Sequence, residues 1–195
     1  MRVRPTFLAP MALAAGLAAS ASAAHAAVFV VGAFDNSSSG GVGLDSISLV
    51  VGQLFDVSAD PNDLWSAGAL PRYSDADGLT GDRFATAADD SGQPVGTRIG
   101  ADFGLWTQNG LSAPFGTLVG ELGGVFQPLG TNFHGAAWGT GTLHLFYWDS
   151  NFADNFGTIS ATISAVPEPA EWALMVLGFG AAGALLRGRR ALALG

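Results

Sequence analysis

Residues Gly141–Ala165, with the sequence GTLHLFYWDSNFADNFGTISATISA, contain the two clearest β-patterned segments of the chain and the loop that joins them. In the first segment Leu143, Leu145 and Tyr147 share one face, and the opposite face is also largely apolar. A strand that is apolar on both faces is typical of the inside of a sheet. In the second segment, 158–165, isoleucine or alanine alternates with serine or threonine, which predicts a strand with one face in the core.

Short segments of the same kind recur along the chain between turns rich in glycine or aspartate, and no segment has a sustained helical period. Strands at this spacing predict an all-β domain, a β-sandwich or jelly roll. The expected strands are 28–33, 46–51, 54–59, 97–102, 116–121, 141–148 and 158–165. The segment 36–41, rich in serine and glycine, is expected to be a flexible turn or linker.

Composition excludes several classes of protein. The chain has 195 residues, which suits one domain, and it has no cysteine, so disulfides, thiolate metal sites and a cysteine nucleophile are excluded. Its net charge is −8, but five of its eight arginines lie near the two ends. Residues 27–165 carry three Arg against thirteen Asp and one Glu, a net charge of −11. Such a surface repels phosphate backbones, so no nucleic-acid partner is expected.

The first 26 residues have the pattern of a secretory signal peptide. Arg2 and Arg4 precede the apolar run 7–21, and Ala24-His25-Ala26 is typical of a small-x-small cleavage site. We therefore expect a signal peptide over 1–26, an exported protein, and a folded domain over 27–165.

The last 30 residues, 166–195, have a different pattern. Two prolines on either side of a glutamate end the preceding strand, and a tryptophan then opens the apolar stretch 172–186, which is expected to be a short single transmembrane helix. An arginine-rich tail, 187–190, follows and is expected to stay on the cytoplasmic side. The residues that define this pattern are Pro167, Glu168, Pro169, Trp172, Arg187, Arg189 and Arg190.

This arrangement, with its motif at 167–173, resembles the PEP-CTERM sorting signal in the variant where the triplet is followed by two residues and Trp-Ala. The resemblance implies that the chain is a substrate of exosortase, a membrane transpeptidase of Gram-negative bacteria that make exopolysaccharide. It further implies a precursor anchored in the inner membrane, and then a protein in the periplasm, at the cell surface or in the extracellular matrix.

The loop 149–157 is the best candidate for a ligand site. It offers two carboxylates and two side-chain amides within nine residues, between two strands that fix its ends. Calcium prefers six to eight oxygen ligands, so this composition favours a calcium site. Asp and Asn are also the usual residues of turns, and a purely structural loop is the alternative.

Residues 111–165 also resemble the PA-I type galactophilic lectins, which are calcium-dependent, galactose-binding-like β-sandwiches. The resemblance rests on three stretches, 114–123, 141–149 and 154–157. It implies that the side chains of Asp149, Asp154 and Asn155 bind calcium, and that backbone carbonyls of Phe152 and Asp60 complete the site. The sugar-contacting positions of that family correspond to Ser74 and Asp77.

The sequence departs from these lectins in a shorter loop, in a carboxylate at Asp154 where the family has an amide, and at both sugar-contacting positions. The function expected is that of a surface or exopolysaccharide-matrix protein with a calcium-assisted carbohydrate-binding module. The alternative is a structural surface or biofilm-matrix protein without a sugar site. No nucleophile elbow, phosphate loop or zinc-ligand spacing occurs, so an enzyme is not expected.

Overall fold

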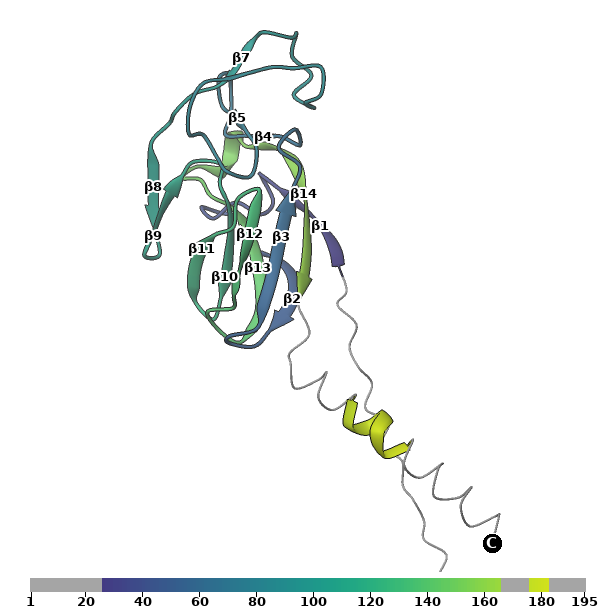
Figure 1. The fold of residues 1–195 in the computed structure, drawn as a ribbon. Helices are drawn as coiled ribbons and strands as arrows, with labels where there is room; N and C mark the ends of the chain where they lie inside the picture. The colour runs from purple at the N-terminus through teal and green to yellow at the C-terminus, as the bar shows by residue number, and fades with distance from the viewer. Residues whose placement is uncertain (1–25, 166–175, 183–195) are drawn as a thin grey trace, which may run out of the picture. The chain divides into compact units, whose positions relative to one another are not determined.

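The computed structural model describes residues 26–165 and 176–182, which belong to two separate units (Figure 1). The first described range is all-β, apart from one 3-10 turn, η1 (Phe152–Asp154). Its strands are β1 (Ala26–Gly32), β2 (Leu44–Leu49), β3 (Leu54–Ala59), β4 (Trp65–Ser66), β5 (Tyr73–Ser74), β6 (Arg83–Phe84), β7 (Arg98–Gly100), β8 (Leu105–Gln108), β9 (Leu111–Pro114), β10 (Leu118–Leu122), β11 (Val125–Pro128), β12 (Asn132–Ala136), β13 (Gly141–Tyr147) and β14 (Phe156–Ala165).

The strands form a β-sandwich of two main sheets. One sheet has the order β12-β3-β14-β4-β5, and β1 pairs with β14 on its other edge. The second sheet has the order β11-β10-β13-β2. Two hairpins, β6–β7 and β8–β9, lie outside these sheets. All pairings between named strands are antiparallel, as expected for strands joined by short turns.

The core lies between the two sheets and consists of the inward faces of their long strands. The fully buried side chains of Leu143 and Leu145 on β13 belong to the same cluster as Ile159 and Ile163 on β14. Each such side chain contributes about 1.5–3 kcal/mol by leaving water. The pattern of residues 141–165 therefore predicted the core-facing positions of both strands, and β13 is an inner strand between β10 and β2, as expected.

Other expectations need correction. The expected strand 97–102 is only three residues long, Arg98–Gly100, and the hairpin of β8 and β9 was not expected. The segment 36–41 is not a free linker: Ser37 is fully buried and forms a parallel bridge with Tyr147. Its backbone is held on β13 by hydrogen bonds on both sides of Tyr147.

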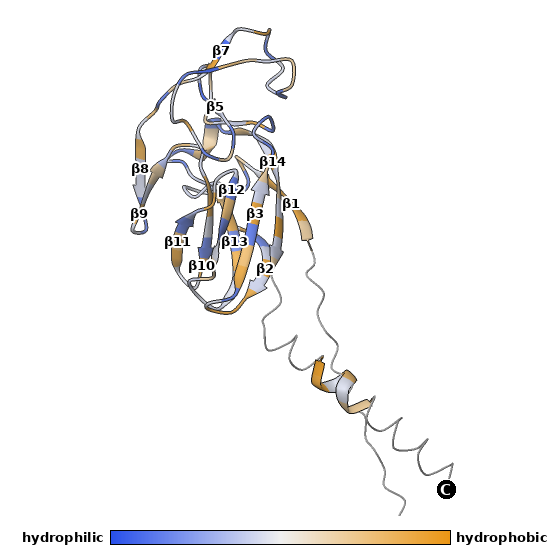
Figure 2. Cartoon of the chain, in the orientation of Figure 1, coloured by the Kyte–Doolittle hydropathy of each residue, from blue (hydrophilic) through white to orange (hydrophobic). Residues whose placement is uncertain are grey.

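The second described range, 176–182, is helical, and Figure 2 shows it in orange to white because it contains only apolar residues and glycine. Among the described residues, no helix has both the length and the apolar character needed to cross a membrane. The expected signal peptide up to residue 25 and all residues of the sorting pattern, Pro167, Glu168, Pro169, Trp172, Arg187, Arg189 and Arg190, lie outside the described residues. The expected strand that follows the signal peptide begins at Ala26, as β1.

Candidate functional site

The candidate site is the loop between β13 and β14, and the two strands hold both of its ends. Asp149 follows the end of β13 by two residues, and Asn155 directly precedes β14. At the start of β14, Gly157 has a φ of +86°, and a Cβ there would lie 3.0 Å from the Cα of Trp65. A glycine is therefore needed for β4 to pair so closely with the end of this loop.

The segment around Ser38, which is far from the loop in the sequence, fixes the start of the loop through hydrogen bonds. The hydroxyl of Ser38 accepts a hydrogen bond from the backbone N–H of Asp149 at 3.2 Å and can donate to the carbonyl of the same residue at 3.1 Å. The N–H of Ser38 donates to the carbonyl of Tyr147 at 2.8 Å. The segment that the sequence presents as a linker therefore fixes the position of the first acidic residue of the loop.

Asp149 is a buried carboxylate, with 4% of the residue exposed. One of its oxygens accepts a hydrogen bond from the N–H of Ser150 at 2.7 Å. Burial raises the pKa of the Asp149 carboxyl above its usual value, and the charge of Asp154 acts in the same direction, although hydrogen bonds from Ser150 and Asn155 oppose it. A bound cation would remove this conflict, because it stabilises the charged form.

Asn155 brings a second buried oxygen to the loop. Its Nδ2 donates to the carbonyl of Ala33 at 3.2 Å, which leaves its Oδ1 pointing elsewhere. Among the described residues, this buried Oδ1 has no hydrogen-bond partner. An unpartnered buried carbonyl costs about 1–3 kcal/mol, so a ligand that this oxygen could bind would stabilise the fold.

Asp154 supplies the third side chain, at the end of η1. Its Oδ1 accepts a hydrogen bond from Asn151 at 2.8 Å, and its Oδ2 lies 3.5 Å from Nη1 of Arg72. A Cβ on Gly68 would lie 2.5 Å from the same Oδ2, so the backbone of the β4–β5 loop closely approaches this carboxylate. Asp154 is largely exposed, in contrast to the two buried members of the group.

The side chains of Asp149, Asp154 and Asn155 offer ligand types that a hard cation such as calcium prefers. They combine two carboxylates with one unpartnered amide oxygen, and calcium completes six to eight positions with carbonyls and water. The described residues contain no group of three or more His, Cys, Asp or Glu side chains placed to hold a metal. The loop of Asp149 is not such a group either, because it has only two carboxylates. Its third side-chain oxygen belongs to the amide of Asn155.

Phe152, expected to offer its backbone carbonyl, lies in η1 in the same loop. That carbonyl accepts the hydrogen bond of the Asn155 N–H at 3.1 Å, so it closes the 3-10 turn. The ring of Phe152 packs on Phe34 with ring centroids 5.3 Å apart. The structure thus gives Phe152 a role in shaping the loop.

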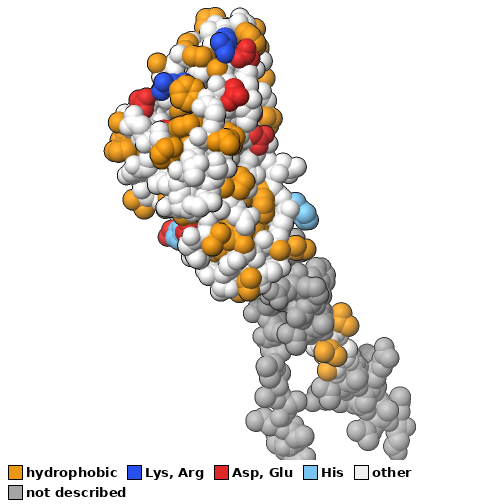
Figure 3. Space-filling model, turned by 90° about the vertical axis from the view of Figure 1, so that its left-hand side faces the viewer, with side chains coloured by type: hydrophobic (Ala, Val, Ile, Leu, Met, Phe, Trp, Pro, Cys, Tyr) orange, Lys and Arg blue, Asp and Glu red, His pale blue; other side chains and the backbone are white. Residues whose placement is uncertain are grey.

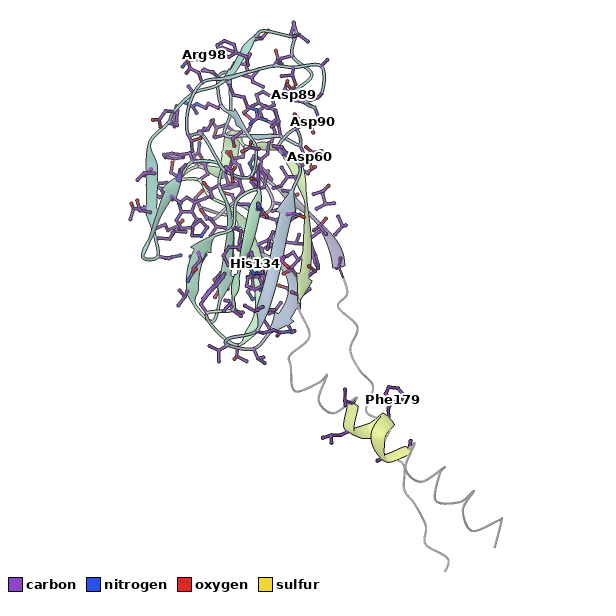
Figure 4. All side chains as sticks on the ribbon, in the orientation of Figure 1. Asp60, Asp89, Asp90, Arg98, His134 and Phe179 are labelled. Atoms are coloured by element: carbon purple, nitrogen blue, oxygen red, sulfur yellow. The ribbon has the colours of Figure 1, made fainter. Side chains whose placement is uncertain are left out.

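Asp60 is the one predicted calcium ligand that the structure places elsewhere. It follows β3, whose last residue, Ala59, pairs with Ala161 on β14. Asp60 is one residue past this antiparallel pair, so about five residues of β14, or roughly 16 Å at about 3.3 Å per residue, separate it from Asn155. Figure 4 labels Asp60 in the same region as Asp89 and Asp90. The register thus separates Asp60 from the loop of Asp149 along β14, and the backbone that approaches Asp154 is that of Gly68.

Ser74 and Asp77, the predicted sugar-contacting residues, line one surface hollow together with Asp75 and Arg83. Neither side chain is free within the described part of the chain. The two carboxylate oxygens of Asp77 accept hydrogen bonds from the N–H and the hydroxyl of Thr131, at 2.7 and 2.8 Å. Ser74 is buried and its hydroxyl lies 3.4 Å from the carbonyl of Gly116. The hollow is not lined by the loop of Asp149.

Three residues of the site were not expected from the sequence. Gly68 and Arg72 approach Asp154 from the β4–β5 loop, and Ser38 supports Asp149. The guanidinium of Arg72 also lies 4.6 Å from the centroid of the Phe103 ring. No spacing in the sequence predicts these contacts, because each contact depends on which strands become neighbours in the fold.

Among known proteins, a solved structure is similar to this chain. No protein-family model matches the chain, and no curated protein matches it. The solved structure is described as "EclA N-terminal domain; PllA-like lectin", with a TM-score of 0.44 and 20% sequence identity. The match covers 71% of this chain and 95% of that one.

Proposed function

We propose that this protein is an exported surface or matrix protein whose β-sandwich binds carbohydrate with the help of calcium. The observation that carries the proposal is the buried, unpartnered Oδ1 of Asn155 in a loop that also holds the buried Asp149 and the carboxylate of Asp154. The resemblance of residues 111–165 to galactophilic lectins supports the choice of ligand. The net charge of −11 on residues 27–165 favours divalent cations over anionic partners.

In this function Asp149, Asp154 and the Oδ1 of Asn155 would hold a calcium ion, which would supply Lewis-acid binding for hydroxyls of a sugar. Asn151 orients Asp154 through the hydrogen bond between their side chains. Arg72 reaches the same carboxylate, so calcium and Arg72 compete for Asp154. The role is binding, with no catalytic step assigned to any residue.

A glycan array, probed with the purified protein in calcium and again with a calcium chelator, tests this function. We expect binding to at least one glycan in calcium and its loss with the chelator. Asp149→Asn should weaken that binding about tenfold or more, which corresponds to ~1.4 kcal/mol or more. Asp60→Asn is the matched control and should leave it unchanged, because Asp60 lies away from the loop. Signals that are equal with and without chelator would contradict the proposal.

A second candidate function, a structural surface or matrix protein without a sugar site, is favoured by the engagement of Asp77 with Thr131 and by the burial of Ser74. Under this function the loop still binds calcium, and the ion only stabilises the fold. Calcium would then raise the melting temperature, while the array would show no glycan signal in either buffer.

We further propose that the chain reaches the cell surface as an exosortase substrate, on the basis of the proline-glutamate-proline triplet and the apolar segment 172–186. Replacing Pro167, Glu168 and Pro169 by alanine should leave an uncleaved precursor in the inner membrane. Cell fractionation and the apparent mass on immunoblots measure this. Processing identical to that of the wild type would contradict the role of the triplet.

A further inference from the structure

One end of the sandwich exposes apolar side chains, and its turns contain no charged residue, although the carboxylate of the neighbouring Glu121 accepts a hydrogen bond from the N–H of Gly124 in one of them. Three turns form this end: 49–54 between β2 and β3, 122–125 between β10 and β11, and 136–141 between β12 and β13. Their common location follows from the pairings of Leu54 with Ala136 and of Leu49 with Gly141, and from the antiparallel course of β10 beside β13. None of the residues in the three turns is charged, in a domain whose net charge is −11.

The residues of these turns that face solvent include the usual glycines, Gly52, Gly123 and Gly124, and also several hydrophobic side chains. Val51 is 66% exposed, and Val50, Leu54 and Val125 are also exposed. Figure 3 shows the same polarity on one face: arginine and most visible acidic side chains lie in the upper part, and the lowest part of the coloured domain shows hydrophobic and uncharged side chains.

Both ends of the described domain also emerge here. Ala26 pairs with Ser164, and Ala165 pairs with Phe55, next to the exposed Leu54. Trp172, the first residue of the expected membrane segment, is seven residues after Ala165. At no more than about 3.3–3.6 Å per residue, this connection spans at most about 25 Å. A membrane anchor would therefore hold this end, rather than the acidic end, close to the bilayer.

We propose that this apolar end of the sandwich, including the turn 49–54, docks on the lipid bilayer while the precursor is anchored. Apolar side chains at such a surface bury about 5–10 Å into the interface between headgroups and acyl chains. The negative surface potential of a bilayer repels the acidic end and so favours the same orientation. The loop of Asp149 follows the opposite end of β13, so this orientation presents the calcium site away from the membrane.

The proposal rests on the proposed anchor at 172–186, and the test separates the two. The chain has no cysteine, so a single cysteine introduced by Val51→Cys or Val125→Cys carries one fluorophore. Val95→Cys is the matched control, because Val95 is 71% exposed in the loop between β6 and β7, at the top of Figure 1. The labelled full chains are incorporated into phosphatidylethanolamine–phosphatidylglycerol vesicles that contain a spin-labelled lipid as quencher, and membrane attachment is measured by flotation.

The expected result is that the labels at positions 51 and 125 are quenched by lipid about twofold or more beyond the label at 95, as interfacial burial requires. Equal quenching at all three positions in chains that float with the vesicles would overturn the docking and leave the anchor standing. Chains that do not float would overturn both proposals. If the label at position 51 becomes shielded from solvent without lipid, and more so at higher protein concentration, the surface binds a second copy of the chain. That result would overturn the proposal that it docks on the bilayer.

Discussion

Tyr147 is a single residue that connects the core with the candidate site. Its ring packs edge-on against Trp65 with centroids 4.6 Å apart, and its hydroxyl is buried without a hydrogen-bond partner among the described residues. Burial raises the pKa of the Tyr147 hydroxyl well above its usual value, and the charges of Asp149 and Asp154 add to this. The hydroxyl therefore stays neutral, and its lost hydration is uncompensated.

Replacing Tyr147 by phenylalanine should raise the free energy of unfolding by about 1 kcal/mol, because the unpartnered group is removed and the ring stays. Urea unfolding in chelator, followed by tryptophan fluorescence, measures this. Tyr73→Phe, at the only other tyrosine, is the control and should change stability little. A loss of stability in Tyr147→Phe would show that the hydroxyl has a partner.

The shifted pKa of Asp89 predicts how the stability of the fold depends on pH. Burial acts to raise the pKa of the Asp89 carboxyl, but hydrogen bonds donated by Ser91 and Thr86 outweigh it and lower the pKa below the usual value. The folded state thus binds the proton less tightly than the unfolded state does. The contribution of Asp89 to stability is complete above the unfolded pKa of about 3.9 and is lost as the pH falls through the lower folded pKa.

We therefore expect Asp89→Asn to lower the free energy of unfolding at pH 7, and the difference from the wild type to shrink towards pH 3. Unfolding curves of both proteins at a series of pH values measure this. A difference that does not change with pH would show that the charge of Asp89 has no part in it.

At the scale of elements, the segment 156–157 of β14 joins the candidate loop to β4. Gly157 and Gly52 have nearly the same positive φ, +86° and +88°. An added Cβ at Gly52 would meet nothing within 4 Å, whereas at Gly157 it would meet the backbone of Trp65 and Leu64 at 3.0 and 3.1 Å. An alanine at either position would be strained by the positive φ, but only an alanine at position 157 would also be crowded by neighbouring backbone.

Both Gly52→Ala and Gly157→Ala should lose about 1–3 kcal/mol of stability through strain at positive φ. Gly157→Ala should lose more than Gly52→Ala, and its affinity for calcium should fall, because β4 is forced away from the loop. Thermal unfolding and calcium titration of the two variants measure these effects. Equal losses in both variants would mean that the close approach of β4 is unimportant.

The elements also explain what could be predicted from the sequence. The alternation in residues 141–165 is local, so it predicted β13, β14, their buried faces and the loop of Asp149 correctly. The two-residue strands β4, β5 and β6 have no period to detect, and they exist because neighbouring strands complete their hydrogen bonds. The separation of Asp60 from the loop and the approach of Gly68 to it could not be predicted, since sequence resemblance does not fix the register of β3 and β4 on β14.

At the scale of the whole molecule, charge separates the two ends of the sandwich. The turns next to Ala26 and Ala165 are uncharged, and the loops at the other end carry the acidic residues of the candidate site. Self-repulsion within a domain of net charge −11 opposes folding and is screened by salt. A cation bound at Asp149 and Asp154, as proposed, would relieve part of this repulsion.

Because of this arrangement, calcium should stabilise the fold more than an equal ionic strength of sodium chloride does. Differential scanning fluorimetry of the wild type and of Asp149→Asn measures the change in melting temperature. We expect the advantage of calcium over sodium to disappear in Asp149→Asn. An equal response of both proteins would indicate unspecific screening.

Isothermal titration of calcium into the full chain at physiological salt tests the central claim most directly. The account predicts one calcium ion per chain, the loss of this binding in Asp149→Asn, and its retention in Asp60→Asn. Absence of binding in the wild type, or binding that Asp149→Asn leaves unchanged, would contradict it.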